Sequence, residues 1–166
     1  MLLTIIFKKY LDENFHISKN IFYFQLLITF LFYILYPTKD YFILSILLII
    51  SIIDIKEYII PNFLILLLMS FKILDTNYNT LKPDFIPLIF LSFLFILSMM
   101  DLGIGMGDVK LLFAIFIVKG GVFLIQLLLV LSIIIFLVGI YLLIIKKEKS
   151  YKFPLGPFIL LSFLLI

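Results

Sequence analysis

The longest apolar run, Val122–Ile145, contains 24 residues and no charged side chain. A helix that crosses the hydrocarbon core of a bilayer needs about 20 predominantly apolar residues. The chain has 166 residues, of which 65% are hydrophobic and 14% are charged, whereas soluble domains are roughly half apolar and a quarter charged. These proportions predict an integral membrane protein. The length suits one compact bundle, so no second domain is expected.

Other apolar runs predict an all-α fold, a polytopic helical membrane bundle with six to seven spanning segments. Helices are expected because a chain in lipid must satisfy its own backbone hydrogen bonds, and the runs do not alternate as barrel strands do. Residues 1–20 are expected to form a cytoplasmic or interfacial lead-in, and residues 21–166 a single transmembrane domain. The expected spans are Ile21–Tyr36, Tyr41–Ile60, Asn62–Leu74, Phe85–Met100, Val109–Val118, Val122–Ile145 and a last segment that opens at Phe153 and runs to Ile166.

The lysines predict the orientation of the bundle, since the chain has no arginine. Cytoplasmic loops of membrane proteins carry an excess of positive charge. With the N-terminus in the cytoplasm, nine lysines lie inside (Lys8, Lys9, Lys19, Lys56, Lys110, Lys146, Lys147, Lys149 and Lys152) and four lie outside (Lys39, Lys72, Lys82 and Lys119). The expected location is therefore the cell inner (cytoplasmic) membrane, as a multi-pass protein. Because the positive charge is interpreted as topology, no nucleic-acid partner is expected.

Composition also limits the chemistry that the chain can perform. There is no cysteine and only one histidine, His16, so disulfides, thiolate metal sites and histidine metal sites are not expected. No serine or cysteine nucleophile has a base near it in sequence. The sequence therefore predicts neither a metal nor another cofactor, and it leaves carboxylic acids as the candidate reactive groups.

Asp54 is an acid inside an apolar run. It follows thirteen uncharged residues, Tyr41–Ile53, and an acid in a spanning segment costs about 2.5–3.5 kcal/mol on insertion scales and is usually functional. Lys56 and Glu57 come directly after it. An alternative interpretation is therefore that Asp54 marks a helix end at the lipid headgroups, where the long side chain of Lys56 pairs with it.

Asp108 follows three alternating glycines, Gly103, Gly105 and Gly107. Glycines let backbone approach closely, which suits an extended peptide docking beside the acid. The alternative is that Asp108 is an N-cap, because the residues that follow it are typical of a helix start. Counting spans between the two acids places both Asp54 and Asp108 at the cytoplasmic ends of their segments.

Two neighbouring carboxyl groups are suited to peptide hydrolysis. Hydrolysis needs a water molecule held between a base and an acid, and two carboxylates that share one proton supply both. Asp54 is expected near a helix C-terminus, where the helix dipole disfavours negative charge, and Asp108 near an N-terminus, where the dipole favours it. On this basis Asp108 is expected to be the ionised base, with the shared proton on Asp54.

The motifs together resemble the type IV prepilin peptidase family, membrane aspartic peptidases with a Gly-x-Gly-Asp motif. Asp54 stands seven residues before Pro61-Asn62, as the first acid of the family precedes its Pro-Asp or Pro-Asn. The stretch from Gly103 to Leu111 resembles the glycine-rich second motif, and Phe153-Pro154-Leu155-Gly156-Pro157-Phe158 resembles a Pro-Phe-Gly-Pro segment. Presenilin-like proteases share the Gly-x-Gly-Asp pattern, but their Pro-Ala-Leu motif is missing here. The resemblance covers residues from about 18 to 166.

The resemblance implies an intramembrane aspartic endopeptidase that removes the basic leader peptide of type IV prepilins or pseudopilins at the cytoplasmic membrane face. Asp54 and Asp108 would be the catalytic pair that activates water, and Gly103, Gly105 and Gly107 would shape the loop. Lys110 would lie close to the pair and orient a carboxylate or a substrate carbonyl; the alternative is a lysine that snorkels at a helix start. Pro61, Asn62, Pro154, Gly156 and Pro157 would be supporting residues.

Departures from the family pattern limit this expectation. Bifunctional members carry an extra first helix and a cysteine-containing cytoplasmic domain, and they also methylate the new N-terminus. A chain without cysteine resembles a peptidase-only form, so no methyltransferase activity and no use of S-adenosylmethionine are expected. Two alternatives stay open: a catalytically inactive scaffold of a pilus or secretion assembly, and a small ion-coupled transporter. The sequence does not predict the oligomeric state.

Overall fold

A computed structural model describes residues 19–35, 40–74, 85–100, 105–145 and 153–166. These residues form seven helices and no strand, which confirms the all-α prediction for this part of the chain. The expected lead-in lies outside the described residues up to position 18, and its last two positions begin the first helix. The helices are α2 (Lys19–Leu35), α3 (Asp40–Glu57), α4 (Asn62–Leu74), α5 (Phe85–Met99), α6 (Met106–Lys119), α7 (Gly121–Ile144) and α8 (Gly156–Leu165).

Each helix corresponds to one expected span, and most bounds differ by one or two residues. The differences of three residues are at the end of α3, at the start of α6 and at the start of α8, which begins at Gly156 instead of Phe153. Helix α3 ends at Glu57, three residues before the expected Ile60. Tyr58 adopts the left-handed region with φ 56°, and its N–H donates to the carbonyl of Asp54, so the chain turns out of the helix there. Helix α6 begins at Met106, three residues before the expected start, with Gly105 as its N-cap.

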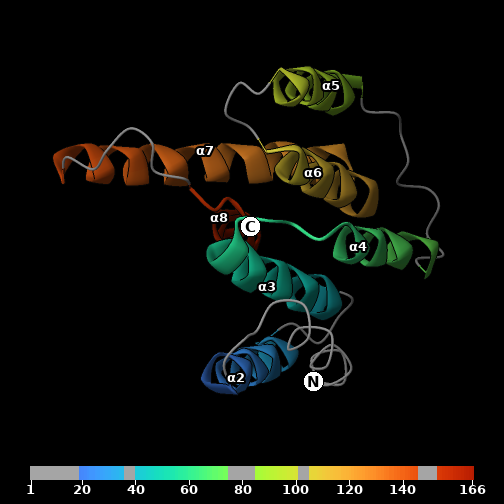
Figure 1. Ribbon diagram of the computed structural model, residues 1–166. Helices are drawn as coiled ribbons and strands as arrows, with labels where there is room; N and C mark the ends of the chain where they lie inside the picture. Colours follow the sequence, from blue (N-terminus) through green and yellow to red (C-terminus); the bar gives the residue numbers. More distant parts are fainter. Residues whose placement is uncertain (1–18, 36–39, 75–84, 101–104, 146–152) are drawn as a thin grey trace.

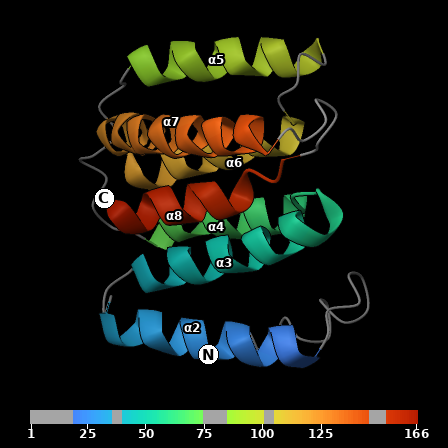
Figure 2. The same ribbon diagram turned by 90° about the vertical axis from the view of Figure 1, so that its left-hand side faces the viewer.

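Helix α3 is the centre of the bundle. Eleven of its eighteen residues are buried, and the buried positions from Ile43 to Ser51 are consecutive, so the helix is enclosed on all sides. A helix that is apolar all round belongs in a core. It packs against α2, α4 and most extensively α8. Figure 2 shows α5 at the top and α2 at the bottom, with the other five helices between them.

Helix α6 joins α4, α5 and α7. It packs against all three, and α7 in turn packs against α8 (Figure 1). Gly120, with φ 87° and ψ 175°, is the single residue between α6 and α7, and its N–H donates to the carbonyl of Phe116. This backbone conformation is strained for residues with a side chain, so glycine is needed to reverse the chain in so few residues.

An ion pair fixes the end of the bundle at which α3 begins and α6 ends. Lys119 contacts Asp40, and its ammonium group also lies 5.4 Å and 5.5 Å from the ring centroids of Phe123 and Phe163. One lysine therefore links α3, α6, α7 and α8. The chain directions then place the end of α3, the start of α6 and the start of α8 together at the opposite end of the bundle, on the right in Figure 2.

Helix α7 is long and apolar enough to cross a membrane. Its 24 residues span about 36 Å at 1.5 Å per residue, more than the hydrocarbon thickness of about 30 Å. Among the described helices it is the one that meets both criteria; α4, α5, α6 and α8 have 10 to 15 residues. Large apolar side chains are nevertheless exposed over most of the bundle, which is rare for soluble proteins and typical of a surface that faces lipid.

Candidate active site

Asp54 lies in the last turn of α3 and points into the protein. Its side chain is buried, with 5% of its surface exposed, so it is not a solvated acid at the headgroups. Its Oδ2 atom accepts a hydrogen bond of 2.7 Å from the backbone N–H of Gly156. A buried carboxylate needs such partners, because removing an unpaired charge from water is costly. Lys56, its expected partner, lies 3.9 Å from the carboxylate of Glu57.

Gly156 is the first residue of α8, and it lies against the side chain of Asp54. A Cβ atom at this position would meet Asp54 Oδ2 at 3.0 Å, Asp54 Cβ at 3.2 Å and Ser51 Cα at 3.3 Å. With any other residue here, these neighbouring atoms would have to move by a few tenths of an ångström, so glycine allows the closest approach. The next residue, Pro157, fits the start of a helix because it has no N–H to satisfy. The rings of Phe153 and Phe158 stack at 4.5 Å around this turn.

Asp108 lies in the first turn of α6, at the third helical position. The N-cap of this helix is Gly105, so the interpretation of Asp108 as the N-cap is wrong. Its carboxylate instead reaches back and accepts a hydrogen bond from the Gly105 backbone N–H, as an acid at this position does in a capping box. A Cβ atom on Gly105 would lie 2.7 Å from Asp108 Oδ2, a distance that forbids the contact for any other residue.

Gly107 brings α6 against the segment that follows Asp54. A Cβ atom at this position would lie 3.1 Å from Cβ of Ile60, on the stretch between α3 and α4. The two described glycines of the motif therefore have separate roles: Gly105 leaves room for the Asp108 carboxylate, and Gly107 leaves room for the neighbouring chain. Gly103 lies outside the described residues.

The two acids come from different helices and face a common region. Asp54 is buried and Asp108 is half-buried. They are near enough for the negative charge of Asp54 to repel that of Asp108. Each also accepts one hydrogen bond from a backbone N–H, that of Gly156 or that of Gly105. Charged groups that repel one another in a buried place favour a state in which one of them holds a proton.

The helix dipoles no longer distinguish the two acids. From the sequence, only Asp108 was expected at a helix N-terminus. The structure places the N-terminus of α8 at Asp54 as well, because the Gly156 N–H donates to its carboxylate. A helix N-terminus favours negative charge. The physical reason for assigning the shared proton to Asp54 is therefore removed, and the sequence missed it because the donor is a backbone atom.

Lys110 is exposed and bonds to a residue of another helix. Its Nζ atom donates a hydrogen bond of 3.1 Å to Oδ1 of Asn62, the first residue of α4. Within the described part of the chain, Lys110 thus bonds to Asn62, and neither acid forms an ion pair with it. Pro61 comes before Asn62, and its carbonyl accepts the N–H groups of Leu64 and Ile65 at the start of α4. Asn62 and Lys110 together connect α4 to α6.

The described residues contain no group of three or more His, Cys, Asp or Glu side chains that could hold a metal ion. What the site does offer is two carboxyl groups, each held by a backbone N–H, at one end of an apolar helical bundle. Pro154 lies two residues before Gly156, the first residue of α8.

Fold and site together define a helical-bundle protein with a carboxylate pair and a largely apolar exterior. A model of the type IV leader peptidase family matches residues 41–144, which include both acids. The chain belongs to this family, and it is a peptidase. No curated protein and no solved structure matches the chain. The match ends before the Pro154–Pro157 segment, so the contact of Gly156 with Asp54 is information that the structure adds.

Proposed function

We propose that this protein is an intramembrane aspartic endopeptidase that removes the basic leader peptide of type IV prepilins or pseudopilins at the cytoplasmic membrane face. Membership of the type IV leader peptidase family supports the reaction class. The observation that carries the proposal is the pairing of Asp54 and Asp108, which interact electrostatically although they lie on different helices.

In the proposed reaction, one carboxylate removes a proton from a water molecule as the water oxygen attacks the scissile carbonyl carbon. The other carboxyl group, which holds the shared proton, donates it to the carbonyl oxygen, and a neutral tetrahedral diol results. Collapse of the diol re-forms the carbonyl and breaks the C–N bond. The nitrogen takes up the proton that the base had received, and one hydroxyl proton returns to the pair. One water molecule is consumed for each peptide bond that is cut, and the two acids return to their starting protonation state.

The backbone hydrogen bonds give each acid a fixed position in this reaction. Gly156 N–H occupies Oδ2 of Asp54, which leaves Oδ1 for the water or the substrate. Gly105 N–H holds the Asp108 carboxylate against the start of α6. Preorganised groups need no rearrangement as charge moves, which is where much of enzymatic rate enhancement arises.

The proposed topology is multi-pass, with a cytoplasmic N-terminus. Family members are membrane proteins, and α7 can cross a bilayer. The excess of lysines on the side of Asp54 and Asp108 supports this orientation. In this orientation, a basic leader stays near anionic lipid on the cytoplasmic side, and the scissile bond lies where the two acids meet.

Co-expression with a tagged prepilin tests the proposal. We expect wild-type protein to shorten the prepilin, with the cut located by gel shift and N-terminal sequencing. Asp54→Asn and Asp108→Asn should each abolish cleavage at normal membrane levels. Asp40→Asn is the matched control, because Asp40 begins the same helix α3 at the opposite end of the bundle. Cleavage that survives in either site variant would refute the dyad, and no cleavage of cognate pilins by wild type would favour a scaffold.

A further inference from the structure

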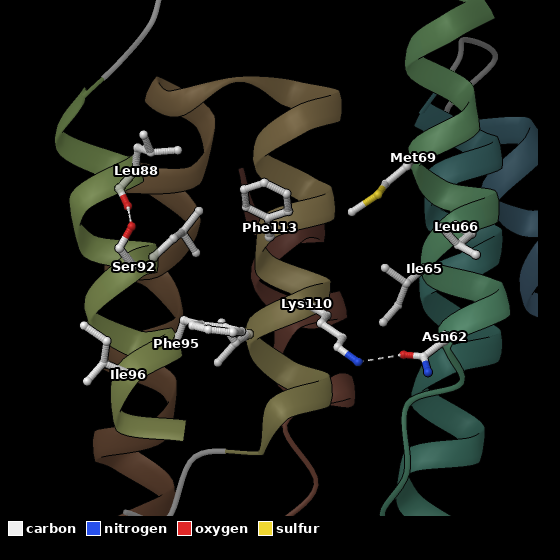
Figure 3. A pocket seen from close by; sticks show the side chains of 12 residues that line it. Asn62, Ile65, Leu66, Met69, Leu88, Ser92, Phe95, Ile96, Lys110 and Phe113 are labelled. Carbon is white, nitrogen blue, oxygen red and sulfur yellow. Dashed lines mark hydrogen bonds between the residues drawn. The ribbon is translucent and has the colours of Figure 1, made fainter. Parts of the chain in front are cut away.

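A groove lies between α4, α5 and α6 and encloses a volume of about 620 Å³. Both α4 and α5 pack against α6, and the groove occupies the space that separates them over α6 (Figure 3). Nine of its twelve lining side chains are apolar. Its volume is in the range of roughly 300–1,000 Å³ that ligand pockets have.

The groove has a buried floor and an exposed rim. Ile65, Leu91 and Val109, one from each helix, are each only 3% exposed and form the floor. The rim includes Leu66 and Ile96, which are 64% and 55% exposed. In Figure 3, Met69 of α4 points toward α6, and Phe113 lies on α6 between α4 and α5. Side chains entering from the rim would therefore meet a continuous apolar surface.

One end of the groove is polar, and that end lies at the same end of the bundle as the two acids. The polar end consists of Lys110 and Asn62, joined by their 3.1 Å hydrogen bond. Lys110 and Asp108 are both near the start of α6, and Asn62 follows Ile60, which lies against Gly107, by two residues. The groove thus opens at the end of the bundle where α6 begins, and it continues along α6 toward Phe113.

We propose that this groove binds the apolar helix of the substrate, in the part that directly follows the scissile bond. The proposal rests on the proposed function and adds the surface that the substrate occupies. Along α4 the groove runs from Asn62 to Met69, seven residues or about 10 Å. That length accommodates about two turns of a docked helix, lying beside α6.

The polar end distinguishes a peptide from a lipid chain as the occupant. An extended peptide beside the two acids exposes backbone carbonyls that no helix satisfies, and in an apolar surrounding each needs a donor. The Lys110 ammonium group has donors beyond the one given to Asn62, and the Asn62 amide nitrogen is also a donor. An acyl chain has no such requirement. A segment that is extended at the cut and then becomes an apolar helix needs both the polar end and the apolar groove, in this order.

Cross-linking tests the proposal. Because the chain has no cysteine, an introduced cysteine is the one thiol of the peptidase that can form a disulfide. Ser92 lines the groove on α5, and Ser132 is its matched control on the exposed face of α7. Both are exposed helical serines whose hydroxyls bond to a preceding carbonyl, at 2.8 Å in each case. We would pair Ser92→Cys or Ser132→Cys, each with Asp108→Asn to retain the substrate, with a full-length prepilin carrying one cysteine within two turns after the cut. Mild oxidation should then give a disulfide.

We expect Ser92→Cys to give at least tenfold more cross-linked product than Ser132→Cys. Added cysteine-free prepilin should lower the yield of that product, because it competes for the same groove. Two results would contradict substrate binding in the groove and leave the proposed function unaffected. One is equal cross-linking of the two variants, and the other is no cross-linking of Ser92→Cys although wild type cleaves the same prepilin. Absence of cleavage by wild type would overturn both.

A kinetic measurement provides the second test. Ser92→Trp should narrow the groove, whereas Ser132→Trp should not. For each variant we would compare kcat/KM on full-length prepilin with that on a short peptide ending two residues after the cut. Ser92→Trp should lower the ratio of the two values at least fivefold relative to wild type, and Ser132→Trp should leave it unchanged. A ratio unaffected by Ser92→Trp would contradict binding in the groove.

Discussion

The backbone N–H of Gly156 donates a 2.7 Å hydrogen bond to Asp54 Oδ2, although 102 residues separate the two in sequence. The contact joins the first residue of α8 to the last turn of α3, the two helices that pack most extensively. It holds the side chain of a buried acid through a backbone N–H, which every residue except proline would keep at position 156. A side chain at position 156 would instead act on Asp54 through the space that its Cβ takes up.

Replacing Gly156 with alanine should lower activity more than stability. The new Cβ would lie 3.0 Å from Asp54 Oδ2 and 3.3 Å from Ser51 Cα, so α8 must shift and the hydrogen bond must lengthen. A hydrogen bond to a charged group is worth about 1.5–3 kcal/mol, and we expect kcat for prepilin cleavage to fall about 10- to 100-fold.

Gly139→Ala is the control for this substitution, because a Cβ there meets nothing within 4 Å on the exposed α7. It should keep full activity. A Gly156→Ala protein as active as Gly139→Ala would show that the bond to Asp54 is dispensable.

Gly105→Ala should act on the other acid. Its Cβ would lie 2.7 Å from Asp108 Oδ2, which is closer than any carbon can approach, so the carboxylate must turn away from the Gly105 N–H. We expect cleavage to drop at least about tenfold, since misplacing a group by about 1 Å can lower the rate by that order or more. Membrane levels and thermal unfolding in detergent should be measured beside it. Normal cleavage by a well-folded Gly105→Ala protein would show that Gly105 is not needed to position Asp108.

The ion pair between Asp40 and Lys119 should contribute to stability and not to cleavage. It lies at the end of the bundle away from the two proposed catalytic acids, and both side chains are partly buried. A double-mutant cycle of Asp40→Asn and Lys119→Met, followed by thermal unfolding, should give a coupling energy of about 1 kcal/mol, toward the upper end for exposed pairs because of the burial. Prepilin cleavage below the unfolding temperature should stay within about twofold of wild type. A large loss of cleavage in Asp40→Asn would mean that this end takes part in function.

Gly120→Ala should destabilise the bundle without changing the candidate active site. Its φ of 87° and ψ of 175° lie in a region that is nearly restricted to glycine, although a Cβ would meet nothing within 4 Å. Backbone strain of this kind costs about 1–3 kcal/mol. The unfolding midpoint of Gly120→Ala should therefore fall below that of wild type, whereas that of Gly139→Ala should not. Equal midpoints for the two alanine variants would show that the α6–α7 turn relaxes.

Sequence reasoning predicted helices well where the chain marks its own boundaries. Helix α4 has the expected bounds, because Pro61 and Asn62 mark its start. The end of helix α3 was predicted three residues too late, since the apolar character of Ile59 and Ile60 continues after the helix has ended at Glu57. Hydropathy reports the surroundings of a side chain and not the φ angle of its backbone, and only the φ of Tyr58 ends this helix.

The two acids of the candidate site could be predicted from the sequence, but the residues that hold them in place could not. Asp54 and Asp108 stand out because charge is rare in apolar runs. Gly156 was singled out as part of a motif, but its role depends on a backbone N–H, and every residue except proline has one. Asn62 was expected to support the pair, and the structure instead bonds it to Lys110. Such partners become visible only when the helices are placed in space.

The bond between Gly156 and Asp54 joins an early segment of the chain to a late one. A ribosome completes α3 and α6, with both acids, before it reaches residue 156. Until α8 has packed against α3, the Asp54 carboxylate lacks the N–H that holds it. Under the proposed function, we therefore expect a chain whose α8 has not yet packed against α3 to cleave more slowly than the complete bundle, for the same reason as Gly156→Ala.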